Sequence, residues 1–186
     1  SFTFESHFCR MDLSTRIKQV MVDVPDFPKP GIVFKDITPL FQNVSLSHDL
    51  VLAMADGARK LHADAVLGLE SRGFLYGMPI AMNLGMPFIM ARKKGKLPRS
   101  VYSVTYDLEY GQSTLEIHMD AIAPGQRVLI HDDVLATGGT AAAAAELVRL
   151  AGGIVVGFQF IVELSFLEGR SKLESYGVDV VTFASY

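Results

Sequence analysis

Two adjacent carboxylates, Asp132 and Asp133, precede a small turn with the sequence Ala-Thr-Gly-Gly-Thr at residues 136–140. An apolar run with β-branched residues comes before them, as in a buried strand, and an alanine-rich run follows, as in a helix. A turn that enters a helix presents unpaired N–H groups and the positive end of the helix dipole. Threonine hydroxyls add donors, and glycines let a ligand approach the backbone closely. The spacing therefore predicts a phosphate site with two carboxylates directly upstream.

The order of these groups excludes two common phosphate-binding motifs. A P-loop needs a lysine after its glycines, and none occurs here. A dinucleotide-binding motif places its acid downstream of the glycines, whereas these acids precede them. Carboxylates accept hydrogen bonds from vicinal hydroxyls, so a ribose 5-phosphate fits this layout. The alternative is a strand-to-helix corner with a capping threonine and solvated aspartates, which is the weaker interpretation for the complete run.

Two further stretches carry concentrated positive charge. Arg72 follows the apolar run 65–69, and open α/β sheets bind ligands just beyond the carboxyl ends of such strands. A surface salt bridge is the alternative role for a lone arginine. Residues 92–99 include five basic residues without an interleaved aromatic one, so stacking on nucleic-acid bases is not expected. A mobile loop that brings charge to a polyphosphate is the favoured interpretation.

The elements that must position these groups alternate between strand and helix patterns. This alternation predicts an α/β fold with a central parallel sheet of about five strands flanked by helices on both faces. Two alternating runs, 101–106 and 114–119, predict a small β-hairpin flap inserted in this pattern. We expect strands near 65–69, 87–91, 128–131, 154–162 and 178–183, and helices near 13–21, 45–62, 73–84, 141–150 and 166–176.

The bulk properties of the chain narrow the class of protein. With 186 residues and 49% hydrophobic residues, residues 1–186 suit a single globular domain, and residues 1–10 are expected to be an extension. The net charge of −3 argues against nonspecific nucleic-acid binding. Cys9 is the one cysteine, which excludes a disulfide framework and a cysteine-based metal site. No apolar run has transmembrane length, so we expect a cytoplasmic protein without a membrane partner.

Four motifs in order resemble those of a known family. The run 128–140 resembles the 5-phosphoribosyl-1-pyrophosphate (PRPP) motif of type I phosphoribosyltransferases, with His131 where that family usually keeps an apolar residue. Phe-Pro-Lys-Pro-Gly-Ile-Val-Phe-Lys-Asp-Ile at 27–37 is similar to the base-covering loop of adenine phosphoribosyltransferases. The turn 71–74 and the segment 106–111 resemble the pyrophosphate-binding turn and the closing loop of the same family.

The resemblance implies a fold and a reaction. The fold is that of type I phosphoribosyltransferases, with a base-covering loop at 24–40 and a flexible loop and hairpin flap at 92–120. The reaction transfers the 5-phosphoribosyl group from PRPP to adenine, giving AMP and pyrophosphate, with Mg²⁺ carried by PRPP. A homodimer is expected, without nucleic acid. Two alternatives stay open: a non-catalytic PRPP-sensing regulator on the same fold, and a phosphoribosyltransferase for another base.

The resemblance also implies roles for individual residues. Glu109 and Arg72 are expected to be catalytic, and Tyr110 to belong to the flap. A cis peptide bond is expected between Glu70 and Ser71. Mg²⁺ is expected near Asp132 and Asp133, held through PRPP, with no direct protein ligand assigned. PRPP is expected to bind to Ser71, Arg72, Arg92, Lys93, Lys96, Asp132, Asp133, Ala136, Thr137, Gly138, Gly139 and Thr140, some of the basic residues acting across a dimer interface, and the base to Val33 through its backbone, Lys35 and Val134.

Overall fold

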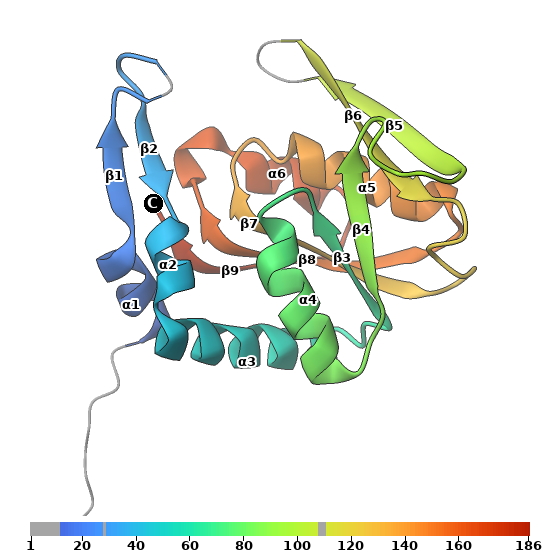
Figure 1. Cartoon of the computed structure of the whole chain (residues 1–186), viewed down its shortest axis with the longest axis horizontal. Helices are drawn as coiled ribbons and strands as arrows, with labels where there is room; N and C mark the ends of the chain where they lie inside the picture. The colour runs from blue at the N-terminus through green and yellow to red at the C-terminus, as the bar shows by residue number, and fades with distance from the viewer. Residues whose placement is uncertain (1–11, 28, 108–110) are drawn as a thin grey trace, which may run out of the picture.

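The computed structural model describes residues 12–27, 29–107 and 111–186. Its main sheet has seven strands in the order β5-β6-β4-β3-β7-β8-β9 (Figure 1). Five neighbouring strands, from β4 to β9, are parallel, which confirms the predicted parallel sheet. The strands are β3 (Ala65–Leu69), β4 (Phe88–Lys93), β5 (Val101–Asp107), β6 (Gln112–His118), β7 (Arg127–Leu135), β8 (Ile154–Glu163) and β9 (Asp179–Ser185).

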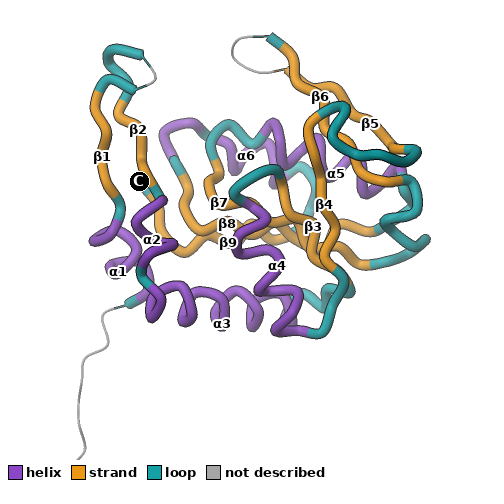
Figure 2. The backbone as a smooth tube through the Cα atoms, in the orientation of Figure 1, coloured by secondary structure: helices purple, strands orange, loops and turns teal. Residues whose placement is uncertain are grey.

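Helices cover both faces of this sheet (Figure 2). One hydrophobic cluster joins one face to α1 (Leu13–Val20), α2 (Thr38–Gln42), α3 (Val44–Lys60) and α4 (Gly73–Leu84). The other cluster joins the opposite face to α5 (Gly139–Leu150) and α6 (Gly169–Glu174). The alanine run buries four side chains of α5, and such small side chains let a helix lie close to a sheet. Packing through these two clusters fixes the positions at which the strands end and the following helices begin.

The hairpin β5–β6 continues the main sheet. β6 pairs antiparallel with β4 as well as with β5, so the predicted flap is an extension of the sheet edge. β4 runs on to Lys93, which is two residues beyond the predicted strand. Arg92 and Lys93 therefore lie on a strand, and the prediction that they belong to a mobile loop is wrong. Backbone pairing with β6 holds them in the sheet.

The N-terminal segment contains a second, smaller sheet. β1 (Val22–Pro25) and β2 (Val33–Asp36) form an antiparallel hairpin, which we call the hood hairpin, where the sequence predicts a loop at 24–40. Phe27 is 51% exposed and packs its ring edge-to-face on Phe34 at 5.3 Å between centroids. The two rings thus stabilise the hairpin itself. Figure 1 shows the hood hairpin standing beside the carboxyl ends of the parallel strands.

The predicted last helix is interrupted. A 3₁₀ turn, η1 (Ser165–Leu167), and the short α6 replace the expected helix at 166–176, because Glu168 between them takes a left-handed conformation with φ 53°. Across the described ranges, the helices are too short or too polar to cross a lipid bilayer.

Candidate phosphate, pyrophosphate and base site

Two helices begin at the carboxyl edge of the parallel strands. α4 begins at Gly73, four residues after β3 ends, and α5 begins at Gly139, four residues after β7 ends. Neither helix has a side-chain hydrogen bond at its N-cap residue, Arg72 or Gly138. At α4 the N–H groups of Phe74 and Leu75 donate to the carbonyls of Ser71 and Arg72, whereas the N–H groups that begin α5, before Ala142, are left for a ligand. Both helix dipoles favour an anion at these N-termini.

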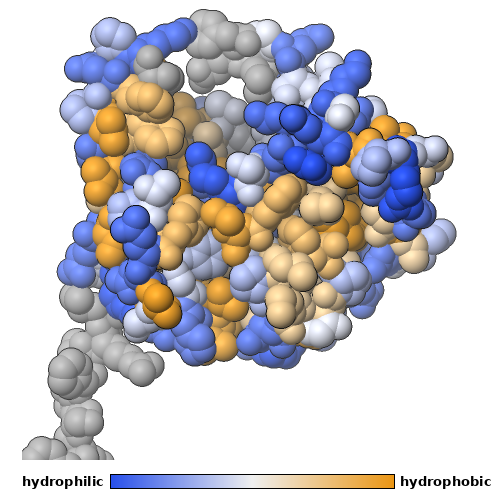
Figure 3. Space-filling view, in the orientation of Figure 1, coloured by the Kyte–Doolittle hydropathy of each residue, from blue (hydrophilic) through white to orange (hydrophobic). Residues whose placement is uncertain are grey.

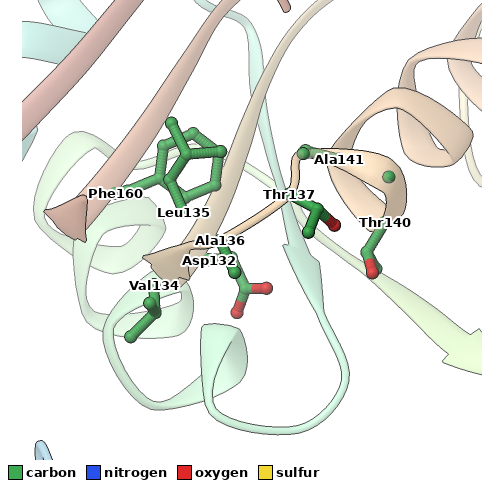
Figure 4. A pocket seen from close by; sticks show the side chains of 10 residues that line it. Asp132, Val134, Leu135, Ala136, Thr137, Thr140, Ala141 and Phe160 are labelled. Atoms are coloured by element: carbon green, nitrogen blue, oxygen red, sulfur yellow. The ribbon is translucent and has the colours of Figure 1, made fainter. Parts of the chain in front are cut away.

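The turn between β7 and α5 forms a concave pocket (Figure 4). The turn residues of the sequence motif line it, with Leu135 and Phe160 behind them. Figure 4 shows the carboxylate of Asp132 and the side chains of Thr137 and Thr140 around this turn. The structure thus brings together the residues predicted to bind the 5′-phosphate: Ala136, Thr137, Gly138, Gly139 and Thr140.

Close packing fixes the shape of this turn. Gly138 has φ +76°, and a Cβ atom there would lie 2.6 Å from the carbonyl oxygen of Gly169 at the start of α6. Only glycine adopts this conformation without strain or collision. From the other side, the hydroxyl of Tyr106 on β5 lies 3.2 Å from Oγ1 of Thr140. The extended hairpin therefore contacts the turn directly.

The two aspartates occupy different environments. Asp133 has a side chain that is 3% exposed and forms an ion pair with the Nε of Arg72. Asp132 lines the pockets on both sides of it, and its Oδ1 accepts the backbone N–H of Asp133 at 2.9 Å. Burial, and next the charge of Asp133, raise the pKa of Asp132 well above its ordinary value. Asp132 is thus the acid that a ligand reaches, and donors from that ligand would stabilise its charge.

A second pocket lies where β3 meets α4. Ser71, Arg72 and Lys93 line it together with both aspartates and Glu70. The peptide bond between Glu70 and Ser71 is cis, as the resemblance implies. Three cationic or donor side chains at a helix N-terminus make this pocket suitable for a second, more highly charged anion.

Glu70 organises the basic residues beside this pocket, a role that the sequence analysis missed. It accepts the backbone N–H of Lys93 at 2.9 Å and two guanidinium N–H groups of Arg92, each at 3.3 Å. Burial alone would raise the pKa of Glu70, but these donors and the nearby charges lower it overall. Its position at the carboxyl end of a strand, two residues before Arg72, was the available signal.

The remaining basic residues lie further out. Arg92 is engaged by Glu70, and its Nη1 also donates to the carbonyl of Lys96 at 3.4 Å. The side chain of Lys96 is exposed and does not line the described pockets. The backbone of this turn is held by the buried Glu116, which accepts the N–H of Gly95 at 2.9 Å. Of the four predicted basic PRPP ligands, Arg72 and Lys93 line this pocket, and Arg92 and Lys96 do not.

A third pocket opens between the hood hairpin and the ends of β7 and β8. The predicted base-binding residues Val33, Lys35 and Val134 line it, with Arg72 and the two aspartates at its floor. Val33 pairs with Pro25, which has no N–H to donate to the Val33 carbonyl. The opposite wall was not predicted, since nothing in the local sequence connects it with the hood; it consists of Leu164, Phe166 and Leu167.

The predicted catalytic Glu109 and flap residue Tyr110 lie outside the described residues. The strands on either side of them are described up to the pair Asp107 and Gln112, whose side chains share a hydrogen bond of 3.0 Å.

His131, which departs from the resembling motif, is fully buried on β7. Its Nδ1 lies 3.0 Å from the carbonyl oxygen of Gln159, and a carbonyl can only accept, so Nδ1 carries the proton. Burial lowers the pKa of His131 to about 4. The imidazole is therefore a neutral core group, one residue away from the ligand-facing acid.

Acidic side chains near the second pocket offer oxygen ligands for a metal ion. Among residues 12–27, 29–107 and 111–186, no three histidine, cysteine or acidic side chains come together as a metal site. Glu70, Asp132 and Asp133 nevertheless line one pocket. Mg²⁺ is commonly held by one or two carboxylates plus substrate phosphates and water, so this pocket fits a magnesium ion that arrives with a polyphosphate.

Comparisons with known proteins agree with this geometry. Residues 47–183 match a family model described as a phosphoribosyl transferase domain. The adenine phosphoribosyltransferase of Ureaplasma parvum serovar 3 is 55% identical over 157 residues, covering 84% of this chain and 91% of that protein. The crystal structure of the Thermoanaerobacter pseudethanolicus enzyme of the same name has a TM-score of 0.88 and 45% identity, covering 92% of this chain and 99% of that one.

A third similar protein was solved with ligands. The Saccharomyces cerevisiae adenine phosphoribosyltransferase, in complex with an imino-altritol bisphosphate and adenine, has a TM-score of 0.84 and 40% identity. The structural alignment covers 92% of this chain and 98% of the yeast chain.

Proposed function

This chain belongs to the phosphoribosyltransferase family and is an adenine phosphoribosyltransferase, and on that premise we propose how its residues divide the reaction. The enzyme transfers the 5-phosphoribosyl group of PRPP to adenine and releases AMP and pyrophosphate, a step of purine salvage. The observation that carries the division of roles is the pair of helix N-termini whose pockets share Asp132, because PRPP has a phosphate at C5 of its ribose and a pyrophosphate at C1.

The 5′-phosphate occupies the turn before α5. The N–H groups of residues 137–140 and the hydroxyls of Thr137 and Thr140 donate to it. Asp132 accepts the ribose hydroxyls, which relieves the cost of its buried charge. Asp133 holds Arg72 in place from below. The sugar is thereby fixed at both ends, and C1 stays oriented toward the base pocket.

The pyrophosphate occupies the pocket at the start of α4. When the bond between C1 and the pyrophosphate oxygen breaks, negative charge grows on the leaving group and positive charge on the ribose. Arg72, Lys93 and the Ser71 turn stabilise the leaving group, and the negative potential of Asp132 stabilises the ribose. Arg92 and Lys96 add positive charge nearby. Mg²⁺, when bound with PRPP near Asp132 and Asp133, supplies further neutralisation of the pyrophosphate.

Adenine occupies the pocket under the hood hairpin. The backbone of Val33 reads the polar edge of the base, while Val134, Leu164 and Phe166 supply apolar contact. Attack by N9 requires loss of a proton from the base, and Glu109, which follows β5, is proposed to accept it. Tyr110 would close with it and exclude water, which otherwise hydrolyses the activated ribose.

The enzyme is proposed to act as a single-domain homodimer in the cytoplasm. A single sheet with a hydrophobic cluster on each face supports the single domain. Exposed Leu75, Met78 and Met82 on α4, with Met90 on β4, support association through that face. One cysteine in the whole chain fits a reducing compartment.

Product binding tests the division between the two anion pockets. Lys93→Gln is expected to weaken pyrophosphate binding and to leave ribose 5-phosphate binding nearly intact. Thr140→Val is expected to do the reverse, since it removes a donor from the other pocket. Calorimetric titration of both variants with both ligands measures this. Equal weakening of both ligands by either variant would contradict the assignment.

A further inference from the structure

Tyr186 lies where the hood hairpin meets the main sheet. The end of the chain, marked C in Figure 1, lies beside β2. The ring of Tyr186 has the Nζ of Lys35 at 4.4 Å from its centroid and the Nζ of Lys18, on α1, at 5.4 Å. The Tyr186 hydroxyl is buried and has no hydrogen-bond partner within the described residues. The Tyr186 side chain therefore interacts mainly through the face of its ring, which attracts cations.

Lys35 is oriented by groups on both sides of it. Its Nζ lies 2.7 and 2.8 Å from the two carboxylate oxygens of Asp23, the residue directly opposite on β1. The Lys35 side chain is 17% exposed, whereas Asp23 is 57% exposed. The ion pair with Asp23 stays within the hood hairpin. The contact with the ring of Tyr186, which follows β9, joins Lys35 to the main sheet.

The backbone of Tyr186 holds the other wall of the base pocket. Its N–H donates to the carbonyl of Glu163 at 2.9 Å, and its carbonyl accepts the N–H of Ser165 at 2.9 Å. These two bonds enclose Leu164, which lines the pocket opposite the hood hairpin. One residue therefore connects both walls of the pocket.

The hood hairpin has few other connections. Its two strands pair extensively with each other, but neither makes an extensive contact with any strand of the main sheet among the described residues. A hairpin held mainly by its own ladder can tilt relative to the sheet. The position of Val33 over the pocket then depends on the small number of contacts that fix the tilt.

We propose that Tyr186 is a positioning residue for the base: its ring holds Lys35, and through Lys35 it sets the distance between the hood hairpin and the far wall of the pocket. The proposal rests on the proposed binding of adenine beside Val33. A leucine at position 186 keeps apolar bulk but has no ring quadrupole to attract the ammonium group. A phenylalanine keeps the ring and removes only a hydroxyl that has no partner.

The test compares AMP with ribose 5-phosphate, which lacks the base. By calorimetric titration, Tyr186→Leu is expected to weaken AMP about 3- to 30-fold, the range typical of a cation–π contact, and to leave ribose 5-phosphate unchanged. Tyr186→Phe is expected to retain AMP affinity. In steady-state assays the KM for adenine should rise with Tyr186→Leu while the KM for PRPP stays constant. Phe183→Leu, on the same strand β9, is the matched control and should change neither ligand.

A double-mutant cycle tests whether the loss of AMP affinity in Tyr186→Leu acts through Lys35. Lys35→Met and Tyr186→Leu together should weaken AMP no more than the stronger single variant, because both remove one contact. Additive losses, equal weakening of both ligands by Tyr186→Leu, or unchanged AMP affinity would each overturn the proposal. If the parent protein bound ribose 5-phosphate but not AMP, the assignment of the base pocket itself would fail.

Discussion

The ionised carboxylate of Asp132 destabilises the folded state. Its side chain is half-buried and lies beside a second aspartate, and the cation Arg72 is paired with that second aspartate. The raised pKa of Asp132 means that the folded state prefers the protonated acid. This destabilisation is absent below about pH 3.8, the ordinary pKa of aspartate, and grows as the pH rises through the folded pKa.

Replacement of this acid should separate stability from function. Asp132→Asn keeps the acceptor for the Asp133 N–H and removes the charge, so we expect unfolding to cost about 0.5–2 kcal/mol more at pH 7. The KM for PRPP should rise roughly 10- to 100-fold, since a charge-assisted hydrogen bond to the ribose is lost. Thermal unfolding between pH 5 and 8 and PRPP kinetics measure both. A variant that is less stable at pH 7, or equally active, would contradict the role.

His131 shows the opposite pH dependence. Its pKa is lowered to about 4 from 6.5. Between pH 6.5 and about pH 4 the imidazole is protonated in the unfolded chain and neutral in the folded one. The free energy of unfolding therefore falls on acidification by up to roughly 3 kcal/mol. His131→Leu should remove that part of the acid sensitivity. Urea unfolding at pH 7.5, 6 and 5 measures it, with the exposed His48→Leu as control. Parallel pH profiles for His131→Leu and the parent would refute this account.

The turn before α5 depends on two glycines for different reasons. At Gly138 a Cβ would meet a positive φ and the Gly169 carbonyl, so Gly138→Ala should destabilise the fold by about 1–3 kcal/mol. At Gly139 a Cβ would have its nearest neighbours at 3.7 Å, an ordinary contact. Gly139→Ala should therefore fold normally and still lose tenfold or more in ribose 5-phosphate affinity, because Gly139 lines the pocket proposed for the phosphate and an added methyl group takes up space there.

Thermal unfolding and calorimetric titration of both glycine variants check this pair. Equal stability losses would show that the turn, not the ligand, requires Gly139. Full ligand affinity in Gly139→Ala would show that the phosphate does not approach that backbone.

The sequence predicted the helices and strands whose ends are determined by local residue types. The bounds of α4 are as expected, since Gly85 takes the left-handed conformation that ends a helix and Pro87 follows. The hood hairpin was missed because prolines at 25, 28 and 30 disfavour strands. The break at Glu168 was missed because nothing in that residue type requires a positive φ.

The candidate site was likewise predicted in part, where its residues are close together in the sequence. The anion pockets were predicted because each is centred on one strand-to-helix turn, although Lys93 and the two aspartates come to the second pocket from other strands. The wall at 164–167 and the contact between Tyr186 and Lys35 join segments more than a hundred residues apart, and only tertiary packing brings them together.

At the scale of the molecule, the proposed dimer has a specific surface. Leu75, Met78 and Met82 on α4 are 52, 46 and 70% exposed, and Figure 3 shows an apolar area over this helix. Sedimentation should give twice the mass of one chain. Met82→Glu should shift the equilibrium toward monomers by placing a charge in the contact. Leu150→Glu, at a 55% exposed leucine on the opposite face, is the control. A monomeric parent, or dissociation by the control alone, would contradict the proposed face.

In the proposed function, the three pockets together bind one PRPP and one adenine. The most direct measurement is pyrophosphate release by the purified protein with PRPP and Mg²⁺, offered adenine, hypoxanthine, guanine, xanthine and orotate separately. We expect turnover with adenine alone, with AMP as product. Turnover of another base would contradict the assignment of the pocket under the hood hairpin. PRPP binding without turnover of any base would contradict the catalytic role of the site.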